Sequence, residues 1–178
     1  MMRYAMLTSL AALGLSACVT DDVDTGDVDG PTTASAVLRD SAGRNVGTAS
    51  VSEDESGLRV RIEATALPQC VHGAHVHAVG RCDAPGFTSA GPHWNPNGRE
   101  HGSLNPQGPH HGDLPNLLVG TDGRGTLEFV LPAGRVGRGD QAMLDGDGAS
   151  LVIHATEDDY RTDPSGNSGA RIACGVLG

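Results

Sequence analysis

Residues 58–64 read LRVRIEA, so apolar and charged side chains alternate along this segment. Successive side chains of a β-strand point to opposite faces, and a two-residue period is therefore typical of a strand with one buried face. The segment predicts a half-buried strand in an antiparallel sheet, where one face packs on the core and the other meets water.

Other short apolar runs are bounded by turn sequences, which lie at residues 40–43 (DSAG), 56–57 (SG) and 122–123 (DG). The last of these lies between two apolar runs and predicts a β-hairpin. In chain order, the remaining predicted strands are residues 36–39, 45–53, 72–79, 117–121, 126–131, 151–155 and 171–177. Short strands at this spacing predict an all-β, antiparallel sandwich or barrel.

Residues 1–17 have the pattern of a secretory signal peptide: Arg3 is followed by an apolar run that is too short to span a membrane. The sequence LSAC at residues 15–18 resembles a bacterial lipobox, which implies cleavage before Cys18 and acylation of this residue. An ordinary signal peptide with a coincidental cysteine is the alternative. Either way we expect export to a compartment where disulfides persist, such as the periplasm or cell envelope.

Residues 18–35 are predicted to form an acidic linker with five aspartates and little apolar bulk. Such a segment stays solvated because it cannot bury enough apolar surface to fold. It does not match a calcium-binding EF-hand loop, since the glutamate that closes such a loop is missing. Val19 rather than aspartate follows Cys18, which by the usual sorting pattern favours anchoring in the outer membrane. A single domain is expected over residues 36–178.

The chain has 178 residues and a formal net charge of −10, and all of its basic side chains are arginines. Nucleic-acid binding is not expected, because it requires a basic surface. The four cysteines form no CxxC pair, so the sequence does not predict a zinc ribbon.

Seven of the eight histidines lie between Val71 and Asp113. His75 and His77 are two residues apart, so on a strand they would point to the same face. Further histidines and Asp113 follow in a tract rich in Gly, Pro and Asn, which is not typical of a helix or a regular strand. Imidazoles with a nearby carboxylate favour a transition-metal site, and we expect the metal to order this long loop.

Five segments, in the same order along the chain, resemble the copper/zinc superoxide dismutases. They are GAHVH (73–77), GPHWNP (91–96), HHGDL (110–114), LVIH (151–154) and GARIACGV (169–176). The resemblance covers residues 36–178 and implies a Greek-key β-sandwich or flattened barrel with long metal-binding and electrostatic loops. It implies conversion of superoxide to oxygen and hydrogen peroxide outside the cytoplasm, by alternating reduction and oxidation of copper. A noncatalytic copper/zinc-binding module on this scaffold, and a purely structural sandwich, are the alternatives.

The resemblance also implies two metal sites that share His93. The copper ligands it implies are His75, His77, His93 and His154, and the zinc ligands are His93, His101, His110 and Asp113. On reduction of copper, His93 is expected to release the metal and take up the proton that it then supplies to the product. Copper and zinc are the expected cofactors.

Two further functional residues and a covering loop follow from the resemblance. Asp158 is expected to link His75 to His101, because metal-bound imidazoles commonly donate their other N–H to a carboxylate. Arg171 is expected to orient the superoxide anion beside the copper. The loop formed by residues 159–169 should cover the channel, and since it contains no lysine to assist steering, the resemblance does not by itself imply a diffusion-limited rate.

In the bacterial branch of the family, the resemblance pairs Cys82 with Cys174, and Phe87 occupies the position of the eukaryotic cysteine. Cys70 then has no evident partner. His72 and His111 are interpreted as structural rather than metal-binding. Superoxide is the expected partner, a membrane is contacted only through the lipid anchor, and monomer and homodimer both remain open.

Overall fold

The computed structural model describes Met1, Gly30 and residues 32–132 and 134–178. Apart from Met1, the predicted signal peptide lies outside these residues, as do Cys18 and most of the acidic linker. The first strand begins at Thr33, three residues before the expected start of the domain at residue 36.

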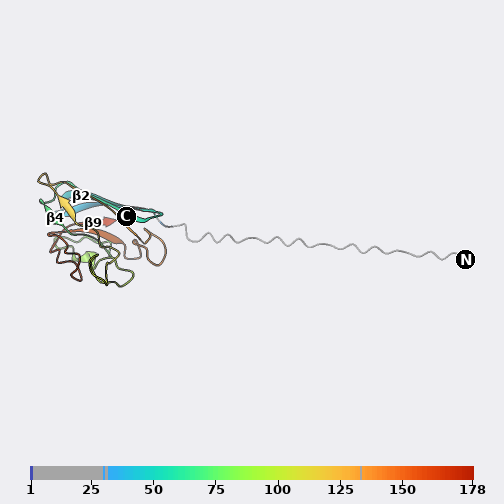
Figure 1. Cartoon of the computed structure of the whole chain (residues 1–178). Coiled ribbons are helices and arrows are strands. Elements are labelled where there is room, and N and C mark those ends of the chain that lie inside the picture. Colours follow the sequence, from blue (N-terminus) through green and yellow to red (C-terminus); the bar gives the residue numbers. More distant parts are fainter. Residues whose placement is uncertain (2–29, 31, 133) are drawn as a thin grey trace.

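Seven strands form one antiparallel sheet. In spatial order they are β5 (Ala74–His77), β8 (Ala149–His154), β9 (Arg171–Leu177), β1 (Thr33–Asp40), β2 (Asn45–Asp54), β3 (Gly57–Ala64) and β7 (Gly125–Leu131). The last strand of the chain therefore pairs with the first, and Ser35 and Gly178 exchange two backbone hydrogen bonds of 2.9 and 3.1 Å. Figure 1 accordingly shows the C-terminus beside β9 and β2.

A second sheet consists of β4 (Cys70–His72) and β6 (Leu117–Val119), paired antiparallel. Only Gly73 separates β4 from β5, and only residues 120–124 separate β6 from β7, so this pair joins the two edges of the large sheet. The result is the expected antiparallel Greek-key barrel, flattened into two layers.

Two details of the predicted strands are wrong. The predicted strand 72–79 is two strands separated by Gly73, where a Cβ would lie 2.8 Å from the Cβ of Ser168. The Asp122–Gly123 turn forms, but its flanking strands do not pair with each other as a hairpin. Instead β6 pairs with β4, and β7 pairs with β3.

The core fills the space between the layers. The alternation in residues 58–64 is confirmed, since Leu58, Val60 and Ile62 are completely buried while Arg61 and Glu63 are exposed. Besides the strands the described chain has one 3-10 helix, η1 (Thr88–Ala90), and long loops over residues 78–116 and 155–170. Among the described residues there is no helix with the length and apolar character needed to cross a bilayer.

Candidate metal centre

Strand β5 supplies the first two histidines of the site. His75 and His77 are fully buried on this edge strand, and the neighbouring strand β8 ends at His154. The N–H of His154 donates to the carbonyl of Gly73 at 2.8 Å, so the end of β8 is fixed against the start of β5. Three of the predicted ligands therefore come from two paired strands.

Backbone contacts bring the loop residues to β5. Isolated β-bridges pair His77 with His93 and His75 with Asp113. The carbonyl of Gly112 accepts a hydrogen bond of 2.9 Å from the N–H of Val76, and a Cβ on Gly112 would collide with the carbonyl oxygen of Val76. The loop thus approaches the strand closely enough to place both side chains beside it.

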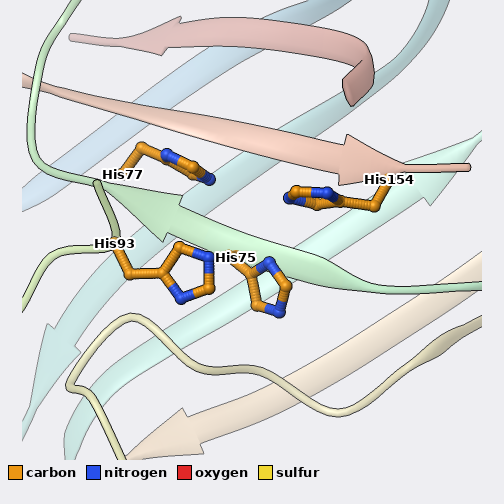
Figure 2. A group of neighbouring side chains, drawn as sticks. All are labelled: His75, His77, His93 and His154. Atoms are coloured by element: carbon orange, nitrogen blue, oxygen red, sulfur yellow. The ribbon is translucent and has the colours of Figure 1, made fainter. Parts of the chain in front are cut away.

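The four-histidine set consists of His75, His77, His93 and His154, and Figure 2 shows their rings gathered around β5, with those of His77 and His154 on the side of β8. One nitrogen of each ring is held by the protein. The four contacts are His75 Nε2 to Asp158 Oδ2 (2.8 Å), His77 Nδ1 to the Gly91 carbonyl (2.9 Å), His93 Nδ1 to Asp113 Oδ1 (2.9 Å) and His154 Nδ1 to the Gly169 carbonyl (3.2 Å).

The second nitrogen of each ring is buried and has no hydrogen-bond partner among the described residues. These atoms are His75 Nδ1, His77 Nε2, His93 Nε2 and His154 Nε2. The set offers one ligand atom per residue, all within 4.8 Å of one another. Buried polar atoms are rarely left unpaired, and four unpaired imidazole nitrogens that converge are what a metal ion would satisfy.

The mixed set consists of His93, His101, His110 and Asp113. Asp113 Oδ1 lies 2.9 Å from His93 Nδ1, 3.0 Å from His101 Nδ1 and 3.3 Å from His110 Nδ1. The last atom also lies 3.3 Å from His93 Nδ1, so three imidazoles and one carboxylate converge. His93 belongs to both sets and turns one nitrogen to each.

His75 also comes close to this group, since its ligand atom lies within 4.8 Å of those of His93, His101 and Asp113. We assign His75 to the four-histidine set, because its Nε2 is bound to Asp158 and only its unpaired Nδ1 is free for a metal.

Asp158 lies between the two sets. Its Oδ2 contacts His75 Nε2 at 2.8 Å and its Oδ1 contacts His101 Nε2 at 3.0 Å, the geometry expected for a carboxylate that orients both rings. The amide of Asn116 holds the backbone of Asp158 in turn, through two hydrogen bonds of 2.9 Å. A Cβ on Gly166 would collide with this carboxylate, so the covering loop can approach only with glycine there.

The predicted disulfide is confirmed, with Cys82 and Cys174 bonded at 2.01 Å. It fastens the loop that precedes His93 to β9, and Phe87 buries its ring beside it. Arg171 donates to the carbonyls of Phe87 (2.7 Å) and Gly91 (2.8 Å) in that loop. Because the Gly91 carbonyl also accepts from His77, one loop orients both the arginine and a member of the four-histidine set.

A cavity of about 750 Å³ opens above the four-histidine set. His93, His154 and Arg171 line it, together with residues of both long loops. A half-buried guanidinium therefore faces the same space as two of the unpaired imidazoles, an arrangement suited to a small anion.

Comparison with known proteins agrees with this geometry. Residues 45–177 match the family described as copper/zinc superoxide dismutase (SODC). The chain belongs to the copper/zinc superoxide dismutase family.

Relatives cover most of the chain. "Superoxide dismutase [Cu-Zn] 2" of Aquifex aeolicus is 40% identical over 146 residues, 81% of this chain and 85% of that protein. "Superoxide dismutase [Cu-Zn]" of Caulobacter vibrioides is 41% identical over 149 residues, 81% and 84% of the two chains. The crystal structure of a double mutant of a SOD-like protein from Bacillus subtilis superposes with a TM-score of 0.77 at 44% identity, covering 80% of this chain and 95% of that chain.

As a member of the copper/zinc superoxide dismutase family, the protein is an enzyme that acts on superoxide and uses copper and zinc. The noncatalytic and structural alternatives are therefore set aside. The donor chemistry of both sets fits these metals. Imidazole nitrogens suit copper, whereas three imidazoles with one carboxylate are a common zinc environment.

Burial sets the protonation of the histidines in the metal-free dismutase. Desolvation lowers the pKa of His75 to about 3, of His77 to about 2 and of His154 to about 4, so these rings stay neutral with a lone pair available. Desolvation also opposes protonation of His101, but Asp113 and Asp158 outweigh it and raise the pKa of His101 to about 9. In the metal-free protein, a proton on His101 would thus take the position that a metal ion would otherwise hold.

Other histidines lie apart from the unpaired nitrogens. Both ring nitrogens of His72 face backbone carbonyls, of His154 at 2.7 Å and of Pro68 at 2.9 Å, and His111 packs against the ring of Trp94. Cys70 is exposed and forms no disulfide within the described part of the chain. Sequence reasoning missed the carbonyls of Gly91 and Gly169 as partners of His77 and His154, because a backbone carbonyl carries no residue signature.

Proposed function

We propose that the protein removes superoxide outside the cytoplasm, with copper held by the four-histidine set and zinc by the mixed set. The observation that carries this proposal is the set of four converging, unpaired imidazole nitrogens, one of which belongs to the ring shared with the mixed set. Copper supplies one-electron reduction and oxidation, so that two superoxide ions and two protons give one oxygen and one hydrogen peroxide. Zinc supplies fixed charge and no redox chemistry.

The residues of the chain supply orientation and a proton. Arg171 holds the anion in the cavity, since two of its N–H groups are anchored on carbonyls and its charge faces His93 and His154. His93 Nε2 takes up a proton when it is not bound to metal and donates it to the developing peroxide. In the metal-free structure Asp113 holds the His93 ring through the 2.9 Å contact with Nδ1, and with zinc bound the two residues would hold the ring in place as ligands of one ion.

Metal analysis with spectroscopy tests this assignment. Seven side chains with one shared ring should hold one copper and one zinc per chain, measured by elemental analysis after loading. Electron paramagnetic resonance should report a nitrogen-rich copper site, and the loaded protein should consume superoxide. Less than one copper per chain with His75 intact would contradict the ligand assignment. Full loading without superoxide consumption would contradict the proposed reaction instead.

We also propose that the protein is an exported lipoprotein anchored through Cys18. The disulfide supports export, because such bonds persist in oxidising compartments. Cell fractionation of the wild type and of Cys18→Ser tests the anchor: the wild type should sediment with membranes, and the variant should be soluble. A soluble wild type would show that the lipobox assignment is wrong.

A further inference from the structure

His110 is the one proposed ligand whose outward ring nitrogen, the one turned away from the metals, has no hydrogen bond in the described structure. In four other rings Asp158 or a backbone carbonyl holds this nitrogen at 2.8–3.2 Å; these are the rings of His75, His77, His101 and His154. His93 is shared and turns both of its nitrogens to the two sets. The outward Nε2 of His110 lies 3.8 Å from Oδ1 of Asp163, so it faces a carboxylate without yet bonding to it.

Asp163 also contacts a second member of the mixed set. The same Oδ1 accepts a hydrogen bond of 2.7 Å from the backbone N–H of His101. The other oxygen, Oδ2, makes no hydrogen bond to the described residues. The side chain is about half exposed, at 50%, and lines the cavity together with His110. One carboxylate outside the mixed set therefore reaches two of its members.

The segment that carries Asp163 is itself held in place. The carbonyl of Tyr160 accepts a hydrogen bond of 3.0 Å from the N–H of Leu104, in the loop that carries His101. Asp159 accepts another of 3.0 Å from the side-chain amide of Asn167, which closes residues 159–167 on themselves. A group can position its neighbours only if its own backbone is supported, and these contacts supply that support.

We propose that Asp163 is a positioning residue of the mixed set, which fixes the backbone of His101 and orients the ring of His110 when zinc is bound. With Nδ1 of His110 on the metal, the ring proton is on Nε2, and the N–H then points toward the acceptor that lies 3.8 Å away. Metal-bound imidazoles commonly donate this N–H to a carboxylate, which fixes the ring and raises its basicity. The inference rests on the proposed assignment of zinc to the mixed set.

The role differs from that of Asp158. Asp158 contacts His75 and His101, one ring from each set, whereas the contacts of Asp163 are confined to the mixed set. Removal of the Asp163 acceptor should therefore weaken zinc binding and leave copper binding as it is.

The test uses two substitutions at this position and one control. Asp163→Ala removes the acceptor, and Asp163→Asn keeps an oxygen that can accept from both partners. Asp140→Ala is the matched control, because it removes an exposed acid of the same cavity that makes no ion pair or side-chain hydrogen bond with the described residues. Zinc affinity is measured on the metal-free protein by competition with a chelator, and copper affinity in the same way with the mixed set filled by zinc.

Asp163→Ala should lower the affinity for zinc by about 10–100-fold and leave that for copper unchanged. Asp163→Asn should recover most of the loss, and the control should behave as the wild type. Zinc has no spectrum of its own in visible light, so cobalt(II) bound in its place reports the ligand geometry. The cobalt absorption bands should change in Asp163→Ala and return in Asp163→Asn.

Three results would overturn the role of Asp163: unchanged zinc affinity in Asp163→Ala, an equal loss for both metals, or an Asp163→Asn variant as weak as Asp163→Ala. Wild-type protein that bound no zinc would instead contradict the ligand assignment on which the role depends. None of these measurements requires that the protein consume superoxide, so failure of the proposed reaction would be seen separately.

Discussion

Asp158 Oδ2 lies 2.8 Å from His75 Nε2, and both side chains are completely buried. The contact fixes the N–H of His75 on Nε2, which leaves Nδ1 free for a metal. Since the other carboxylate oxygen contacts His101 at 3.0 Å, one side chain orients a ring of each metal set. The affinities for the two proposed metals should therefore depend on a residue that contacts neither of them.

Asp158→Asn should lower the affinity for both metals by about 10–100-fold, because an amide cannot accept hydrogen bonds from both rings with the same strength. Competition with a chelator of known affinity measures this for copper and zinc separately. Glu157→Gln is the control, since this neighbouring acid is exposed and makes no side-chain contact in the described structure. Unchanged affinities in Asp158→Asn would show that the orienting role is wrong.

The metal-free protein should be most stable near pH 6.5. His75, His77 and His154 have lowered pKa values of about 3, 2 and 4, so below pH 6.5 the unfolded chain binds protons that the folded chain does not. Stability contributed by these rings is lost as the pH falls. The pKa of His101 is raised to about 9, so its contribution is lost as the pH rises from 6.5 through 9.

Urea unfolding of the metal-free protein between about pH 4 and 9 checks this. The acid side should fall more steeply, because burial also lowers the pKa of His93 and of His111, so that five rings act there and one on the alkaline side. Stability that increased continuously from pH 6.5 to 9 would contradict the state assigned to His101. The same measurement on His101→Gln should show no loss of stability on the alkaline side, while the loss on the acid side remains.

Side-chain patterns predicted the antiparallel strands and the shared face of His75 and His77, because alternation in residues 58–64 and the His75–His77 spacing follow directly from strand geometry. The two ligand sets, Asp158 and Arg171 came instead from the family resemblance. The close approach that requires glycine at position 73 was missed, since it involves Ser168, which is 95 residues away along the chain. Asn116 was missed for a similar reason. Its amide clamps the backbone of Asp158, and nothing in its local sequence indicates that contact.

Cys82→Ser should destabilise the protein by about 2–4 kcal/mol, because the disulfide closes a long loop of the unfolded chain. The same change should loosen the segment that carries the Gly91 carbonyl, so copper affinity should fall as well. Denaturant unfolding and chelator competition measure the two effects. Cys70→Ser is the control, since this exposed thiol forms no disulfide within the described part of the chain, and it should alter neither quantity.

Substitution of Arg171 can separate guidance of the substrate anion from metal binding. The side chain has no lone pair to offer copper, and it contacts the site only through the carbonyls of Phe87 and Gly91. Arg171→Ala should therefore retain stoichiometric copper and a similar resonance spectrum, while losing about tenfold or more of the rate for superoxide. Binding of azide, a small linear anion, should weaken in parallel when it is titrated by absorption.

The rate of Arg171→Lys should lie between those of the wild type and Arg171→Ala. An ammonium keeps the charge but lacks the planar fork that anchors on two carbonyls and orients an anion. His154→Ala, in contrast, should disturb the copper spectrum itself, because it removes one of the four unpaired nitrogens. Full activity and unchanged azide affinity in Arg171→Ala would place the anion guide elsewhere, with Arg99, the other arginine that lines the cavity, as the next residue to substitute.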